Sequence, residues 1–167
     1  IYYSGGSDGF LYKRNLINNK VSIKPCNKIW DFAFDNSNTI YCASWNVNDP
    51  NGGLYKLSND KLVDITKKAN IYSTSLWCLY YDKTTEQLWV GSTDKGIFIV
   101  DLGNKIKSFE PHFFGLQTLE IQSLFTTKEN TTWIGARDKI IILKNDLSFK
   151  ILNKKHIFNK VEKYIKK

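Results

Sequence analysis

The chain of 167 residues contains no methionine, two histidines and three cysteines. His112 and His156 do not stand at the spacing of a metal site or a catalytic triad. The cysteines form no Cys-x-x-Cys pair, which argues against a zinc site or a disulfide framework, and Cys42 and Cys78 lie in apolar runs typical of buried strands. No nucleophile-elbow, phosphate-loop or paired-acid motif is present. We therefore predict no catalytic residue, metal or cofactor in this segment.

Arginine is scarce as well. The formal net charge is +8, but Arg14 and Arg137 are the only arginines among the 24 basic residues. Arginine is the usual residue for bidentate contacts to bases and phosphates. The positive charge therefore indicates a solvated, lysine-rich surface, and we predict no nucleic-acid partner.

Long apolar runs are also missing. No run approaches the ~20 residues of a membrane-spanning helix, and no signal peptide is visible. We predict no direct membrane insertion by this segment. Since position 1 is Ile1 and not Met, we expect the N-terminus to be processed or cut, with any targeting segment outside the chain.

The chain does contain a repeat. Four stretches share an apolar or β-branched residue, then an aromatic residue, then a small-residue stop, and they occupy residues 1–5, 40–44, 88–92 and 132–136. The shared aromatic position recurs at intervals of 39, 48 and 44 residues. A period of 40–50 residues made of short strands is typical of a β-propeller, with one blade in each repeat.

Within each repeat, strand-length segments are bounded by Asn, Asp and Gly clusters. The predicted fold is all-β, a β-propeller of four-stranded antiparallel blades, with about four blades present as part of a larger ring. The first blade has three strands and lacks its innermost one. The predicted divisions are a partial blade at 1–28, blades at 29–74, 75–119 and 120–158, and a further innermost strand at 159–167.

The last segment leaves alternatives open. Val161 and Tyr164 repeat the spacing of Ile29 and Phe32, so 159–167 could close the ring onto the first blade or begin a further blade. An amphipathic helix is also compatible, because apolar residues recur there at i, i+4 spacing. We favour the strand.

The third repeat resembles the two-component-regulator propeller repeat, which reads roughly V-W-x-I-x-x-D, then G-x-L-W-I-G-T, then G-L-x-x-Y-D. The matching residues are 76–79, 81–82, 88–92, 96–98 and Asp101. Residues 121–124 with 132–136 form a second match, and 29–32 with Asp35, 40–41 and 53–55 form a third. The resemblance covers essentially the whole chain and is most specific at 88–92.

This resemblance implies a function. Propellers of that family form periplasmic sensor regions of hybrid two-component systems in Bacteroidetes, usually sense oligosaccharides, and signal through an inner-membrane protein to a histidine kinase. Family sensors commonly hold two seven-bladed propellers and a sandwich domain. The resemblance therefore implies that this chain is a fragment. The partners it implies are an oligosaccharide or other small ligand, further blades of the same polypeptide and a second copy in a homodimer.

Two other functions stay open. Residues 4–12 resemble a strand pair of the WD40 repeat, although no repeat has the Gly-His start and no Trp-Asp closes a third strand. A WD40-like protein-binding scaffold is the first alternative. A propeller-fold lyase or hydrolase is the second, although no cluster of His, Asp or Glu is evident.

Candidate ligand residues follow from propeller topology. Loops joining the second and third strands of a blade share one face with the connections between blades, and ligands usually bind there. The longest such loop, 45–52, combines an aromatic ring with amide and carboxylate groups, which suits a sugar. Alternatively, the segment is an ordinary surface loop rich in Gly, Asn and Pro, and its Trp covers the edge of the blade. The candidates from this loop are Trp45, Asn46, Asp49 and Asn51.

Five further candidates lie at the same predicted face. Trp30 and Trp77 hold equivalent places on innermost strands, where they could line the channel or pack between blades. Tyr72 and His112 lie in connections between blades, and Arg137 follows the second strand of the fourth repeat. The repeat-defining aromatics at positions 2, 41, 89 and 133 are assigned to the core.

Overall fold

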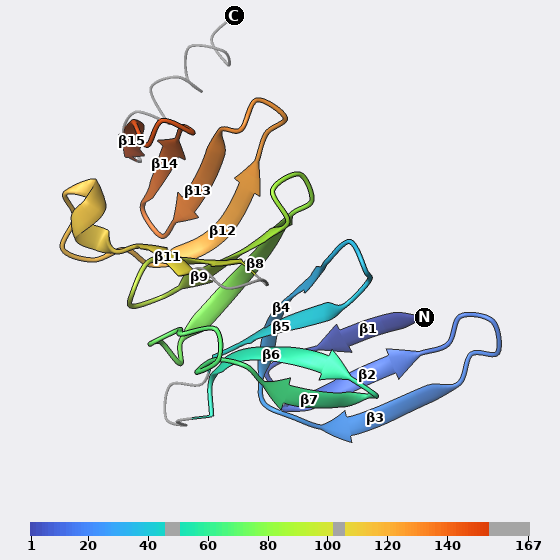
Figure 1. Cartoon of the computed structure of the whole chain (residues 1–167). Helices are drawn as coiled ribbons and strands as arrows, with labels where there is room; N and C mark the ends of the chain where they lie inside the picture. The colour runs from blue at the N-terminus through green and yellow to red at the C-terminus, as the bar shows by residue number, and fades with distance from the viewer. Residues whose placement is uncertain (46–50, 102–105, 154–167) are drawn as a thin grey trace, which may run out of the picture.

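The structure, a computed structural model, describes residues 1–45, 51–101 and 106–153. Within these ranges the chain forms fifteen strands in four antiparallel sheets (Figure 1). The first two sheets contain β1 (Tyr2–Gly5), β2 (Phe10–Arg14) and β3 (Val21–Pro25), then β4 (Ile29–Phe34), β5 (Ile40–Ser44), β6 (Gly53–Ser58) and β7 (Lys61–Asp64). The last two contain β8 (Leu76–Asp82), β9 (Gln87–Ser92), β10 (Ile97–Asp101) and β11 (Ile106–Phe109), then β12 (Ile121–Thr126), β13 (Thr132–Ala136), β14 (Lys139–Leu143) and β15 (Phe149–Asn153).

The sheets follow one another as blades. Each is a meander of sequential strands, and β8 packs between β4 and β12, so the first strands of the second, third and fourth sheets lie innermost (Figure 1). The first sheet has three described strands, and β1 lies beside β4. This arrangement confirms the predicted all-β architecture of propeller blades.

Alternating side chains hold neighbouring blades together. In β5, Ile40 and Cys42 pack with Leu11 of the first sheet, whereas Tyr41 and Ala43 pack with residues of the third sheet. The alternation arises because successive side chains of a strand point to opposite faces. A central blade is therefore buried on both faces, which explains the nearly continuous apolar runs of the repeat.

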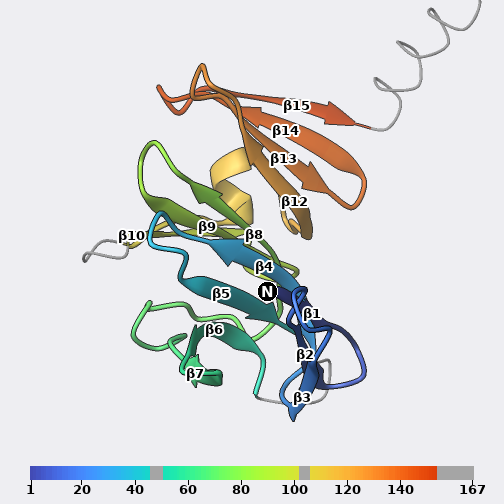
Figure 2. The same ribbon diagram turned by 90° about the vertical axis from the view of Figure 1, so that its right-hand side faces the viewer.

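A short 3₁₀ helix, η1 (Pro111–Phe114), fills the space between the third and fourth sheets (Figure 2). Phe114 is buried there, and its ring contacts those of Phe109 and Phe113. Gly115 ends the helix in the left-handed conformation, at φ 69°, which glycine adopts without steric cost. Phe113 and Phe114 thus fill the space between the third and fourth blades.

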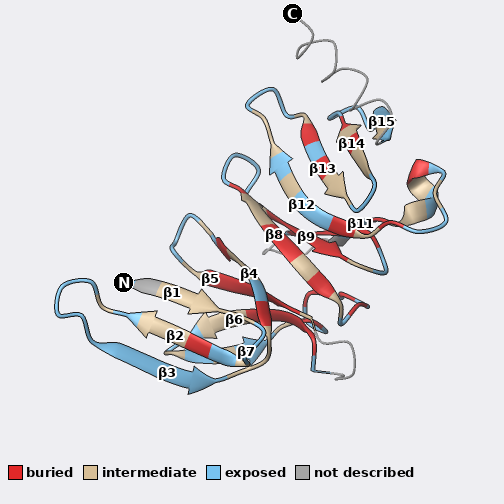
Figure 3. Cartoon of the chain, turned by 180° about the vertical axis from the view of Figure 1, so that it is seen from behind, coloured by how far each residue is buried: buried red, intermediate tan, exposed pale blue. Residues whose placement is uncertain are grey.

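Trp133 corrects one expectation. The sequence assigns it to the core with Trp89, but Trp133 is 41% exposed whereas Trp89 is 8% exposed. The neighbouring residue in β13, Ile134, points into the cluster shared with the third sheet, so Trp133 lies on the opposite face, at the end of the stack. At the other end, β3 is exposed along its whole length (Figure 3).

The predicted strand at 159–167 falls outside the described residues, as do Asn46 and Asp49. Among the helices of the described ranges, none has the length and apolar character needed to cross a membrane.

Candidate functional site

The same irregularity recurs in all three innermost strands. Each carries a β-bulge near its start, where one extra residue opposes the neighbouring second strand. A bulge leaves the extra residue out of the ladder and redirects its side chain. The extra residues are the three equivalents that the repeat aligns, namely Trp30, Trp77 and Gln122.

The structure brings three of the predicted tryptophans together. Trp30 and Trp77 are stacked, with ring centroids 4.5 Å apart and an interplanar angle of 16°. Trp45 packs at a steep angle against both, at 5.5 and 5.4 Å. The indole Nε1 of Trp30 donates a hydrogen bond to the backbone oxygen of Trp45 at 3.0 Å. These interactions join the second and third blades, and Trp30 is still 38% exposed.

Hydrogen bonds fix the rim around this tryptophan cluster (Trp30, Trp45 and Trp77). Trp45 forms an isolated antiparallel bridge with Ser75, at the entrance to the third sheet. The hydroxyl of Ser73 donates to Asp94 Oδ1 at 2.6 Å. The long loop of the second blade is therefore attached to its neighbour by backbone as well as by side chains.

Asn51 lies at a different border of the second blade from Trp45. Its backbone oxygen accepts bonds from Asn27 Nδ2 and from the Tyr55 hydroxyl, at the junction of the first and second sheets. The structure thus places Trp45 and Asn51, which come from one predicted loop, at the two opposite borders of the second blade.

Asp31 is a residue that the sequence reasoning missed. It follows Trp30, and its Oδ2 accepts the backbone N–H of Leu79 on β8 at 2.8 Å while Oδ1 accepts that of Phe32. Burial raises the pKa of Asp31, and the two backbone hydrogen bonds partly offset that increase. This carboxylate links β4 to β8 beside the tryptophan cluster. The Trp-Asp pair was visible in the sequence, but its bulge was not.

Tyr72 and His112 meet through Glu110. The Tyr72 hydroxyl donates to Glu110 Oε1 at 2.6 Å, and His112 Nδ1 lies 3.5 Å from Glu110 Oε2. Burial, and then the bond to Glu110, raise the pKa of Tyr72. The imidazole is 80% exposed. Two successive connections between blades are therefore joined at the surface, and the joining residue Glu110 had not been singled out.

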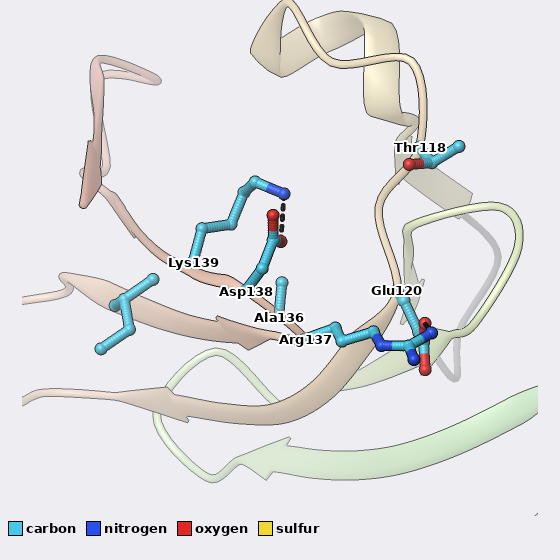
Figure 4. Close-up of a pocket in the computed structure, with 7 residues that line it drawn as sticks. Thr118, Glu120, Ala136, Arg137, Asp138 and Lys139 are labelled. Carbon is cyan, nitrogen blue, oxygen red and sulfur yellow. Dashed lines mark hydrogen bonds and ion pairs between the residues drawn. The ribbon is translucent and has the colours of Figure 1, made fainter. Parts of the chain in front are cut away.

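Arg137 lines a pocket of about 630 Å³ at the fourth sheet, together with polar and apolar side chains (Figure 4). Its Nη1 lies 3.3 Å from Glu120 Oε2, and its backbone N–H donates to the Glu120 backbone oxygen at 3.2 Å. Lys139 and Asp138 form a second ion pair in the lining, which lowers the pKa of Asp138. Glu120 was also missed, since nothing in the sequence connects it to Arg137.

Over the described ranges, no three His, Cys, Asp or Glu side chains converge in a way that could hold a metal ion. The three cysteines are free thiols, and burial raises the pKa of Cys26 to about 11 and those of Cys42 and Cys78 to about 12. Thiols with such pKa values are poor nucleophiles at neutral pH.

Comparison with known proteins gives matches among solved structures. No protein-family model and no curated protein matches the chain. The extracellular domain of a Bacteroides thetaiotaomicron protein described as a one-component system aligns with a TM-score of 0.67 and 20% identity, covering 89% of this chain and 20% of that one. A second extracellular domain from the same organism, described as part of a hybrid two-component system, gives 0.57 and 16%, with 91% and 22% covered.

Virginiamycin B lyase from Staphylococcus aureus gives a TM-score of 0.64 at 9% identity, with 90% of this chain and 54% of the lyase covered. The chain spans about a fifth of the length of the two Bacteroides domains. At these identities the matches establish a shared fold alone. That fold, a set of propeller blades, is also the fold of extracellular domains from Bacteroides two-component signalling proteins, the class of protein that the repeats resemble in sequence.

Proposed function

We propose that this chain is part of an extracytoplasmic, non-catalytic sensor propeller of a two-component signalling protein and that it binds an oligosaccharide at the tryptophan cluster. The observation that carries the proposal is the partly exposed Trp30 stacked on Trp77, with Trp45 packed against both. The three indoles lie at one end of the innermost strands, with Trp45 steeply inclined to the stacked pair, and the partly exposed Trp30 leaves an apolar ring surface open to a ligand.

Such a surface suits a sugar ring, whose C–H groups stack on aromatic faces while its hydroxyls hydrogen-bond to nearby polar groups. Polar side chains lie at the same rim of the second and third blades, where Ser73 bonds to Asp94. The indoles are held rigidly by the Trp30–Trp45 hydrogen bond and by the Trp45–Ser75 bridge. A preorganised surface loses little entropy when a ligand binds.

Signalling would follow from the position of the cluster. Trp30 belongs to the second blade and Trp77 to the third, so a bound sugar would contact two blades at once. A ligand shifts an equilibrium only if it binds one arrangement better than another. A change in how these blades pack would pass to further blades of the polypeptide, or to a second copy, through the exposed end faces.

The test compares two tryptophans of similar exposure, Trp30 at 38% and Trp133 at 41%. Binding of neutral oligosaccharides from xylan, mannan, β-glucan and fructan is measured by calorimetry and by thermal shift, since a ligand raises stability by RT ln(1 + [L]/Kd). We expect Trp30→Ala to weaken binding more than tenfold, and Trp133→Ala to change it less than twofold. If no glycan binds the unsubstituted protein, or if both variants bind as it does, the sensor proposal fails.

A further inference from the structure

We infer that the ligand face has a second, polar subsite on the fourth blade, built from Arg137 and Glu120, and that this subsite selects an uncharged oligosaccharide over an acidic one. The inference rests on the proposed function, because it assigns the part of the ligand that extends beyond the tryptophan cluster. Arg137 and Glu120 are not part of the tryptophan cluster and have no role in the proposal above.

The repeat itself puts this subsite on the same face as the aromatic one. The residue after the second strand is Trp45 in the second blade, Thr93 in the third and Arg137 in the fourth. The backbone N–H of Thr93 donates to the backbone oxygen of Ser75, and that of Arg137 donates to the backbone oxygen of Glu120. Ser75 and Glu120 each directly precede the innermost strand of their blade. At this position the residue is aromatic in the second blade and polar in the third and fourth.

The bulge positions change in the same direction. Stacked Trp30 and Trp77 are followed by Gln122, an exposed amide on β12, the strand that packs against β8. Glu120 precedes Gln122 by two residues, which corresponds to at most about 7 Å of chain. A ligand that stacks on the indoles and continues past Gln122 therefore reaches Glu120 and Arg137. Because the tryptophan cluster belongs to the second and third blades and the Arg137–Glu120 pair to the fourth, a ligand that contacts both must extend from one blade to another, which favours an oligosaccharide over a monosaccharide.

The pocket can hydrogen-bond to hydroxyl groups in both directions. The Arg137 guanidinium carries five N–H donors in a fixed plane, and its side chain is 75% exposed although Nη1 contacts Glu120. Glu120, 35% exposed, supplies carboxylate acceptors beside it. The Thr118 side chain also lines the pocket, on the same chain segment as Glu120 (Figure 4). A vicinal diol can donate to the carboxylate and accept from the guanidinium.

The charges of the lining cancel. Arg137 pairs with Glu120 and Lys139 pairs with Asp138, so the four ionised side chains carry no net charge. A carboxylate or sulfate on the ligand would face as many acidic as basic side chains in the pocket. To bind Arg137 or Lys139 it would have to displace the carboxylate already paired with that residue. An uncharged sugar keeps both pairs intact. The overall charge of +8 is thus not concentrated in this pocket.

The experiment uses the intact polypeptide with neutral oligosaccharides of two to six residues, and with matched oligosaccharides that contain uronic acid. Affinities are measured by calorimetry for the unsubstituted protein, Arg137→Ala, Glu120→Gln and Trp30→Ala. Arg14→Ala is the matched control, because Arg14 is the other arginine, is exposed and contacts Asn19 in the connection between β2 and β3. We expect Arg137→Ala and Glu120→Gln to weaken binding of the longer neutral ligands about tenfold while the disaccharide changes less than twofold.

The outcomes separate the two proposals. Binding weakened more than tenfold for every ligand length in Trp30→Ala, with a length-dependent loss in Arg137→Ala and none in Arg14→Ala, supports both. If Trp30→Ala loses binding but Arg137→Ala and Glu120→Gln bind every length as the unsubstituted protein does, the polar subsite is overturned and the sensor proposal stands. Tighter binding of the acidic ligands than of the neutral ones also overturns the inference. If the unsubstituted protein binds no ligand, both fail.

Discussion

At the scale of single residues, Asp31 connects the second and third blades through backbone hydrogen bonds. Its carboxylate accepts two backbone N–H groups, from Phe32 on its own strand and from Leu79 on the next blade. Replacement by Ala leaves both donors without this acceptor in a partly buried place. We expect Asp31→Ala to lower the free energy of unfolding by about 2 kcal/mol in urea denaturation. The exposed turn residue Asp146, which bonds to Ser148, provides the control and should cost less than about 1 kcal/mol.

The cost of Asp31→Ala should also depend on pH. Burial raises the pKa of Asp31 in the folded state, so the folded protein binds this proton more readily than the unfolded chain. The stabilising contribution of the protonated group is fully present below its unfolded pKa, near 3.9, and is lost as pH rises through the raised folded value. The variant should therefore differ more from the parent at pH 3.5 than at pH 7. A larger difference at pH 7 would contradict the assigned direction of the shift.

At the scale of elements, the small-residue stop of each repeat has a packing cause. A Cβ built on Gly91 of β9 would lie 2.5 Å from Cys78 Sγ on β8 and 2.5 Å from Ile121 Cγ2 on the next blade. A Cβ built on Gly5 would likewise lie 2.8 Å from the Cβ of Ile29 on the following blade. The second strand must therefore end in a small residue where an innermost strand crosses it. This packing requirement explains the small residues that end the second strand in each repeat of the sequence.

We expect Gly91→Ala to destabilise the fold by about 1–3 kcal/mol, because the added methyl group forces two packed side chains to move. Gly6 is the control, since its nearest atom is Asp8 Oδ1 at 3.8 Å, and Gly6→Ala should change stability by less than about 0.5 kcal/mol. Thermal or urea unfolding measures both. Equal stability of the two variants would mean that the blades can separate locally without cost.

The elements also show how far the sequence could be interpreted. Short strands grouped four to a blade could be predicted because alternation and turn residues are local signals. The equivalence of Trp30 and Trp77 was visible, but their stacking was not, since it depends on the bulge and on the distance between blades. The bond from Asp31 to Leu79 and the ion pair from Arg137 to Glu120 join residues far apart in sequence. No local pattern encodes such pairs.

At the scale of the whole molecule, the described sheets form a row in which the principal contacts join neighbouring sheets. Stability of such a row depends on the interfaces between units. The interface between the third and fourth sheets buries Trp89, whereas its equivalent Trp133 lies 41% exposed on the face that points away from the third sheet. The misassignment of Trp133 to the core follows from this geometry, because one repeat cannot show whether another blade covers it.

This geometry leads to a comparison of two equivalent positions. In the chain of 167 residues, we expect Trp89→Ala to cost about 3–5 kcal/mol, the usual loss for a buried tryptophan, and Trp133→Ala to cost less than about 1 kcal/mol. If a further blade of the polypeptide covers the fourth sheet, the two costs should become similar in a longer protein, and Trp133 fluorescence should resist quenching by acrylamide. Trp30 serves as the reference for an exposed indole in both proteins. Quenching of Trp133 that matches Trp30 in the longer protein would show that this end face stays open, and the sensor would then have to signal through some other surface.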